Sequence, residues 1–217
     1  MKTSAAIAAV RFWTDQFADW FSDSEIVTAL NRAALEWVTT RYQMGLTTER
    51  QRSDLSGLLP PPAEGSGRKL VVSPDLRMLY VLALTAEWRV GSDYPNPPVP
   101  VKPVEVDKLA VTLGSVFHRP TNAYPIYTTA RDPLDGLTLT VYSTSAPDRL
   151  RLYYLKAPVV LDVTKPDTEW SDFSEAVQQE LIQTAKRMLL AAQNPDYAVQ
   201  VQSEEPQASG GMGMPTN

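Results

Sequence analysis

The most regular hydrophobic pattern lies near the N-terminus, in SDSEIVTALNRAALEWVTTRYQMG. Apolar residues recur there mainly at three- and four-residue steps, which is the spacing of one face of an α-helix. Ser22 and Glu25 have the spacing of a capping box, in which each side chain bonds a backbone N–H of the first turn. Gly45 is a residue type that commonly ends a helix. The pattern predicts an amphipathic helix over residues 22–44.

Shorter helical patterns flank this helix. Residues 5–21 concentrate apolar and aromatic side chains, and they predict a shorter helix or helical hook that packs on the long one. Residues 47–59 predict a third helical piece, which ends at the three prolines of residues 60–62 because proline cannot continue a helix.

A second long helical pattern lies near the C-terminus, in AVQQELIQTAKRMLLAAQ. Asp172 and Glu175 repeat the capping spacing ahead of it, and Asn194-Pro195 would end it. The basic residues fall toward its C-terminal end, which suits the helix dipole. Residues 201–217 are rich in Gly, Ser and Pro and predict a flexible tail.

Between these helices the hydrophobic period changes to two. Residues 137–142 and 150–155 alternate strictly, and the polar turn sequence between them predicts a β-hairpin with one buried face. Residues 70–72 and 78–90 predict further strands, the second after a short helical turn at 74–76.

A proline-rich segment follows, with five prolines between residues 95 and 103. Since proline lacks an N–H and has a fixed φ, residues 92–104 should form a stiff extended arm and not a central strand or a helix. Residues 106–116 and 124–127 are weaker candidates for strands or edge segments.

These patterns predict an α+β fold in one integrated domain. Its parts are an N-terminal helical region (1–59), a small antiparallel β region with a hairpin and the proline arm (60–170), a long C-terminal helix (171–200) and the flexible tail (201–217).

Composition removes several classes of function. Apolar residues make up 43% of the 217, which favours a soluble globular protein. No apolar run approaches the roughly 18 residues of a membrane span, so we expect no membrane contact. Arg11 and Asp15 interrupt an N-terminal apolar run too short for a secretion signal. With no cysteine and one histidine, disulfides, thiol catalysis and His-rich metal sites are excluded, and we expect no cofactor.

The charge distribution argues against a grip on nucleic acid. The net charge is −5, and residues 161–217 contain three basic and nine acidic side chains. Phosphate binding requires Lys and Arg, so the acidic balance argues against a firm hold on double-stranded DNA, but it does not exclude a surface that such DNA passes without binding.

The only histidine is His118, in the sequence HRPTNAYPIY. A base in a nucleophilic site needs an orienting carboxylate, but no acidic residue lies between 115 and 130. Asp107, Asp132 and Asp135 could in principle pair as glycosidase carboxylates, yet the sequence around the last two is ordinary turn composition. We therefore expect a non-enzymatic protein in which HRPTNAYPIY is a turn leading into a short strand.

The positive signals concern surfaces. A proline arm, a long tail and an aromatic-rich N-terminus are unusual for an isolated compact domain. They favour a protein that contacts neighbours, and the expected interface residues are aromatic or proline. These residues are Trp13, Trp20, Phe21, Tyr94, Pro97, Pro98, Tyr124, Tyr127 and Tyr197.

Four stretches resemble, in order, a group of tailed-bacteriophage virion proteins that includes those of crAss-like phages. They are FWTDQFADWFSDSEIVTALNRAALEWV, HRPTNAYPIY, LTLTVYSTSAPDRLRLYYLKAPVV and FSEAVQQELIQTAKRMLLAAQNPDY. The first carries the family's aromatic-Trp-Thr-Asp hook and a Ser-capped helix with Asn-Arg-Ala; the third ends in Tyr-Leu-x-x-Pro. The likeness covers residues 11–200, and the chain departs from the family in its longer proline arm and its Gly/Met-rich tail.

The resemblance implies a ring protein of the phage neck, the head–tail connector between portal and tail. It implies a dodecameric ring of this chain, contacts with the portal and other neck or tail proteins, synthesis in the host cytoplasm and a final place in the virion. Two other functions remain open from the residues: a non-ring protein-binding module and a virion-associated hydrolase.

Overall fold

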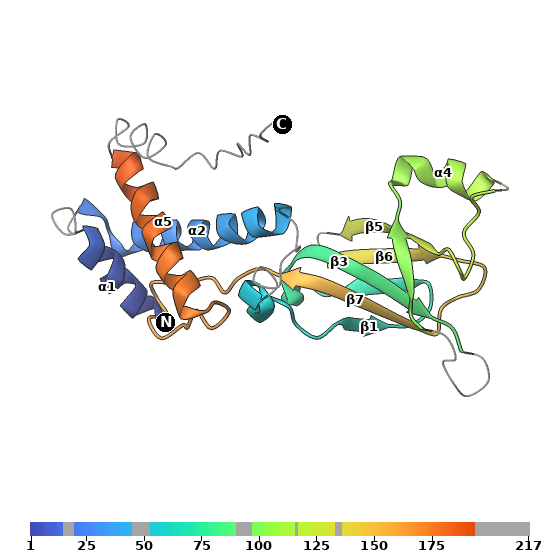
Figure 1. The fold of residues 1–217 in the computed structure, drawn as a ribbon, viewed down its shortest axis with the longest axis horizontal. Helices are drawn as coiled ribbons and strands as arrows, with labels where there is room; N and C mark the ends of the chain where they lie inside the picture. The colour runs from blue at the N-terminus through green and yellow to red at the C-terminus, as the bar shows by residue number, and fades with distance from the viewer. Residues whose placement is uncertain (15–19, 45–52, 90–96, 116, 133–135, 194–217) are drawn as a thin grey trace, which may run out of the picture. The chain divides into compact units, whose positions relative to one another are not determined.

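A computed structural model describes residues 1–14, 20–44, 53–89, 97–115, 117–132 and 136–193 (Figure 1). The chain divides into two compact units: unit 1 combines residues 1–54 with 159–217, and unit 2 contains residues 55–158. The units divide the chain after residues 54 and 158, whereas the regions drawn from the sequence divide it after 59 and 170.

Unit 1 is helical, as the sequence predicts. Its helices are α1 (Thr3–Thr14), α2 (Asp23–Gln43) and α5 (Glu175–Gln193). The Ser22 backbone N–H donates to Glu25 Oε2 at 2.8 Å, and the Glu25 N–H donates to Ser22 Oγ at 3.3 Å, so the predicted capping box is present. The predicted stops at Gly45 and Asn194-Pro195, residues 47–52 of the predicted helical piece at 47–59 and the tail at 201–217 lie outside the described residues.

The start of α5 differs from the prediction. The N-terminal cap is Ser174, whose Oγ accepts from the Val177 N–H at 3.5 Å. Asp172 does not cap the helix: its carboxylate is buried and accepts the Val159 N–H at 2.8 Å. The spacing predicted a cap correctly near this point but assigned it to the wrong side chain.

The three helices pack around one apolar core. Figure 1 shows α5 crossing α2 with α1 beside them, and α2 buries Ile26, Leu30 and Ala33 at helical spacing. Trp170 is fully buried and makes an edge-to-face contact with Phe173, which makes a second one with Trp37. These aromatic contacts fill the space between the helices and the segment that precedes α5.

Residues 159–172 return the chain to unit 1 without a helix or strand, and side chains of α2 and α5 bond to backbone groups near the buried residues Leu161 and Trp170. The Asn31 amide donates to the Leu161 carbonyl at 2.9 Å and accepts the Leu161 N–H at 2.8 Å. Buried Gln178 Nε2 donates to the carbonyl oxygens of Trp170 and Phe173. The N-terminus completes the pairing, because the Thr3 N–H donates to the Thr168 carbonyl at 2.9 Å.

Unit 2 is a seven-stranded sheet in the order β1-β7-β3-β4-β5-β6-β2. Its strands are β1 (Ala63–Gly65), β2 (Lys69–Val72), β3 (Met78–Glu87), β4 (Val99–Pro103), β5 (Ile126–Asp132), β6 (Gly136–Tyr142) and β7 (Arg149–Lys156). All neighbours are antiparallel except β4 and β5. Short 3₁₀ turns at Ser56–Leu58 and Pro74–Leu76 precede β1 and β3, the second as predicted.

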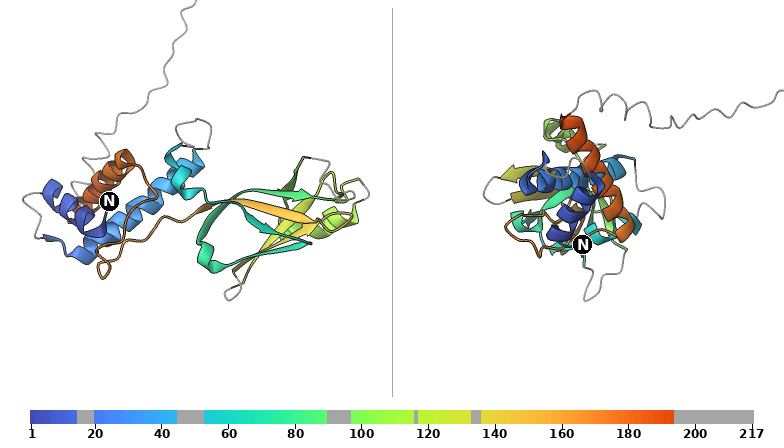
Figure 2. Two further views of the ribbon diagram at one scale, coloured as in Figure 1. Left: turned by 90° about the horizontal axis from the view of Figure 1, so that it is seen from below. Right: turned by 90° about the vertical axis from the view of Figure 1, so that its left-hand side faces the viewer.

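The sheet curls so that its outer strands β1 and β2 come together, and it encloses an apolar core (Figure 2). Two irregularities in the β3–β7 pairing contribute to the bend. Alternate residues of β6 and β7 supply much of this core, among them Leu139, Val141, Leu150 and Leu152. The α+β class is therefore correct, but the β region is a nearly closed seven-stranded sheet and not a small hairpin region.

The predicted hairpin between residues 137–142 and 150–155 is wrong. Strand β6 pairs with β5 and β2, whereas β7 pairs with β3 and β1. The connection crosses the end of the core, where the Asp148 carboxylate accepts the Arg89 N–H at 2.7 Å. Apolar and polar residues alternate in both strands because each strand turns one face to the shared core. The two strands were therefore predicted correctly, but their pairing with each other was not.

The prediction that the proline arm excludes a central strand is also wrong, since β4 lies between β3 and β5. The N–H groups of Lys102 and Val104 donate toward β5. Because residues of a strand alternate, the position of the missing N–H of Pro100 also faces β5, but it lies ahead of Ile126, the first paired residue of β5. The missing N–H of Pro103 faces β3, but it lies beyond Val101, the last residue of β4 that pairs with β3. The prolines thus occupy positions where no ladder bond is lost.

Residues 106–116, a weak strand candidate, instead begin with a helix, α4 (Val106–Gly114). Its apolar residues Val106, Leu109, Ala110 and Leu113 have helical spacing, which fits one face of a helix better than a strand. Of the other weak candidate, 124–127, only Ile126 and Tyr127 belong to a strand, β5.

Gly136 provides a test of the close approach between β6 and the turn after β2. It has φ +84°, and a Cβ there would overlap the Val72 carbonyl oxygen and lie 2.9 Å from Pro74 Cδ. We expect Gly136→Ala to lower the free energy of unfolding by about 3 kcal/mol or more. Gly67→Ala, at φ +75° with open space around it, should cost only about 1 kcal/mol. Urea unfolding followed by circular dichroism measures both, and equal losses would contradict the steric account.

Asn31 provides a test of the returning segment. Asn31→Ala leaves the Leu161 N–H and carbonyl unpaired in a partly buried place, and we expect a loss of about 2 kcal/mol in the free energy of unfolding. Asn122→Ala is the matched control, because the Asn122 amide makes a similar reciprocal pair with Ser145 in an exposed place. That control should lose less than about 1 kcal/mol. A loss no larger for Asn31→Ala would show that the pair at Leu161 is not important for stability.

Candidate interaction surfaces

The structure divides the predicted interface residues into three groups. Trp13, Trp20 and Tyr124 are 47%, 58% and 76% exposed, and Pro97 and Pro98 are exposed as well. Phe21 and Tyr127 are buried within the single chain, so neither presents an exposed ring to a neighbour. Tyr94 and Tyr197 lie outside the described residues.

The exposed tryptophans of unit 1 lie near the end of α1 and the start of α2. Arg11 joins these two helix ends, since its guanidinium donates to the Phe21 carbonyl at 3.3 Å and to the Asp23 carboxylate at 2.8 Å. Phe12, which the sequence analysis did not select, is 77% exposed and stacks edge-to-face on Trp13. The side chains of Phe12, Trp13 and Trp20 form what we call the aromatic surface.

A groove of about 350 Å³ lies in the same unit, between the first half of α2 and the last turns of α5. Its apolar lining comes from Phe21, Ala29, Met188, Leu189 and Ala192. Two charged side chains, Glu25 and Arg32, also line it. The hydrogen bond from Ser22 lowers the pKa of the Glu25 carboxyl below its ordinary value, so this side of the groove is anionic at neutral pH.

Unit 2 has its own exposed apolar surface on α4. None of the residues of α4 is buried, and Figure 1 shows the helix at one end of the sheet, near β5. Val106 is 67% exposed, Leu113 39%, and Phe117, three residues beyond the helix, 93%. We call Val106, Ala110, Leu113 and Phe117 the α4 stripe. Sequence reasoning missed it because residues 106–116 were taken for a strand or an edge segment.

Of the candidate catalytic residues, the structure describes the side chains of His118 and Asp107. His118 is exposed, and its backbone N–H donates to Ser115 Oγ at 3.1 Å. Asp107 is exposed in the first turn of α4, while Asp135 and the Asp132 side chain lie outside what the structure describes. Among the described residues, no group of three or more His, Asp or Glu side chains is placed to hold a metal ion.

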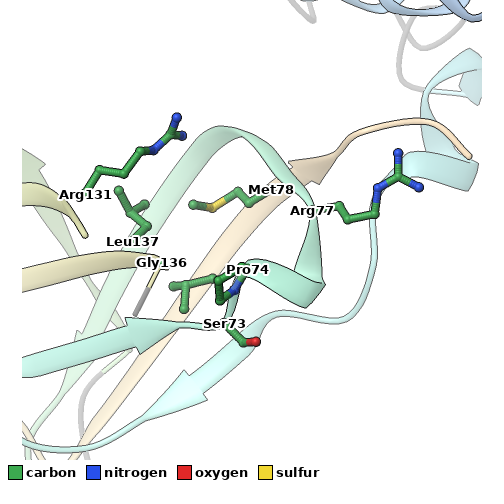
Figure 3. A pocket seen from close by; sticks show the side chains of 8 residues that line it. Ser73, Pro74, Arg77, Met78, Arg131, Gly136 and Leu137 are labelled. Atoms are coloured by element: carbon green, nitrogen blue, oxygen red, sulfur yellow. The ribbon is translucent and has the colours of Figure 1, made fainter. Parts of the chain in front are cut away.

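A cavity of about 280 Å³ lies beside the turn that leads into β3 (Figure 3). Met78 and Leu137 point toward each other across it, while the guanidinium groups of Arg77 and Arg131 point outward. Arg77 is held by a 2.8 Å bond to the Pro158 carbonyl. The cavity combines a mainly apolar lining with a basic rim, and the described residues that line it include no carboxylate or histidine.

Comparison with known proteins adds no family to these observations. No family model matches the chain, and no curated protein is significantly similar to it. None of the helices within the described residues has both the length and the apolar character needed to cross a lipid bilayer.

The tryptophans test the distinction between surface and core. We expect Trp170→Ala to lower the free energy of unfolding by about 4 kcal/mol, because its side chain is fully buried. Trp13→Ala and Trp20→Ala should each change it by no more than about 1 kcal/mol. Chemical denaturation measures all three variants. A large loss for Trp13→Ala or Trp20→Ala would mean that the aromatic surface belongs to the fold and is not available to a neighbour.

Proposed function

We propose that this chain is a structural virion protein that forms a ring in the phage head–tail connector. In this role it joins the portal to the tail around the DNA channel, and it contacts copies of itself, the portal and other neck or tail proteins. The proposal combines the family resemblance of residues 11–200 with the surfaces of the two units. It requires no cofactor and no catalytic residue.

The observation that carries the proposal is that each unit exposes apolar side chains. Unit 1 has the aromatic surface and the α2–α5 groove, and unit 2 has the α4 stripe. Large exposed apolar areas on a folded chain mark places of contact. Two different surfaces on one chain suit head-to-tail contacts between copies, and such contacts produce rings when the rotation closes.

Charge supports the passage of DNA in this picture. The chain is acidic overall at −5, and the exposed face of α5 contributes Glu175 and Glu180. Acidic side chains repel phosphate, so a channel lined in part by them would let the duplex move without being held.

Electron microscopy of the purified chain with portal assemblies tests the proposal. We expect rings of twelve copies on the portal's axis. Because Trp13 and Trp20 are exposed to a neighbour, the double variant Trp13→Ser, Trp20→Ser should lose ring occupancy while it remains folded. Tyr153→Ser is the control, since Tyr153 is an exposed aromatic residue outside both surfaces.

Two outcomes would contradict the ring. A single copy bound off the portal's axis would favour a non-ring binding module. Turnover of cell-wall glycans that His118→Ala abolishes would favour the virion-associated hydrolase.

A further inference from the structure

The α4 stripe has the form of a helix face that lacks a partner. Val106, Ala110 and Leu113 lie within about 60° of one another around the helix at 100° per residue. The neighbouring Leu109 and Thr112 are half-buried, so they mark the side that faces the rest of unit 2. The stripe itself remains exposed, and its apolar area contributes nothing to the core of unit 2.

The helical parts of the α2–α5 groove and of this stripe have similar lengths. The groove lining within α2 runs from Ser24 to Arg32, eight residue steps or about 12 Å of helix. Val106 to Leu113 of the stripe spans seven steps, or about 10 Å of helix. Small side chains at Ala29 and Ala192 leave space in the groove, which suits the way an amphipathic helix places its apolar face between two others.

The charges of the two surfaces are complementary in one orientation. Arg32 lines one end of the groove and makes no ion pair within the described residues. Asp107, beside the first residue of the stripe, likewise has no basic partner there, since Lys108 pairs with Glu105. When Asp107 lies at Arg32, α4 runs antiparallel to α2, and the C-terminal end of α4 lies toward the Phe21 end of the groove.

We propose that α4 of one copy docks in the α2–α5 groove of a second copy, antiparallel to α2. The stripe then becomes buried against Phe21, Ala29 and Ala192, and Asp107 pairs with Arg32. The proposal rests on the proposed function and deepens it, because it specifies the contact between copies. Each copy brings one stripe and one groove, so the contact is head-to-tail and leaves a free surface of each kind for the next copies.

Cross-linking tests this contact directly, because the natural chain has no cysteine. One copy carries Leu113→Cys, and a second copy, enlarged by a tag, carries Ala192→Cys; both positions are exposed. We expect a short thiol cross-linker to give the mixed dimer in at least about tenfold higher yield than with Val111→Cys, the size of effect set by a single apolar contact. Val111 is the matched control, since it is 76% exposed on another side of α4.

Charge reversal tests the orientation. Arg32→Glu in the groove copy should lower the mixed-dimer yield about tenfold, and Asp107→Arg in the helix copy should restore most of it. A chain with both cysteines should give a ladder of covalent oligomers.

Four results would overturn the contact. They are equal yields for the Val111 control, no rescue by the double charge reversal, a dominant product between two Leu113→Cys copies, and a double-cysteine chain linked only within itself. The outcome of the portal experiment is independent of the outcome of the cross-linking experiment. Rings on the portal without this cross-link would reject the contact alone, whereas the cross-link without such rings would reject the neck function alone.

Discussion

The constraint on which unit 1 depends is the need to pair the backbone of residues 159–172. This segment has no regular structure, yet Leu161 and Trp170 within it are buried, so the backbone polar groups beside these two residues need partners in the protein. Asn31 on α2 and Gln178 on α5 supply several of these partners. Through them α2, from the first part of the chain, and α5, from the last, are both held to the same segment, and the groove lies between these two helices.

The sequence predicted which helices and strands form better than it predicted which strands pair with one another. Local periodicity predicts the long helices α2 and α5 and the alternating strands β6 and β7, because it shows which faces of each helix or strand are buried. Periodicity does not report which strand lies beside which, so two alternating strands joined by a short loop were taken for a hairpin. The strand β4 was missed because proline was judged by composition. The direction of each missing N–H, which decides whether a ladder bond is lost, becomes visible only when the partners are known.

The candidate surfaces were predictable only in part, because residue type, like periodicity, does not show which side chains lie next to one another. Trp13 and Trp20 were found by their residue type, but residue type also selected Phe21, whose side chain is buried in the single chain. An aromatic side chain is equally suited to a core and to an interface. The α4 stripe could not be selected at all while its residues were taken for a strand, since the same side chains then fall on two faces.

In the Asn-Arg-Ala sequence of α2, three consecutive residues contribute to the returning segment, the groove and the core of unit 1. Successive residues of a helix point about 100° apart, so the three side chains meet three surroundings. Asn31 bonds the returning segment, Ala33 is fully buried in the core, and Arg32 lines the groove. Two members of the motif therefore serve the fold of unit 1, and only Arg32 is placed to contact another molecule. A resemblance in this motif is therefore mainly a resemblance in the residues that fold the helical unit. Only Arg32 connects the motif to a contact with another molecule.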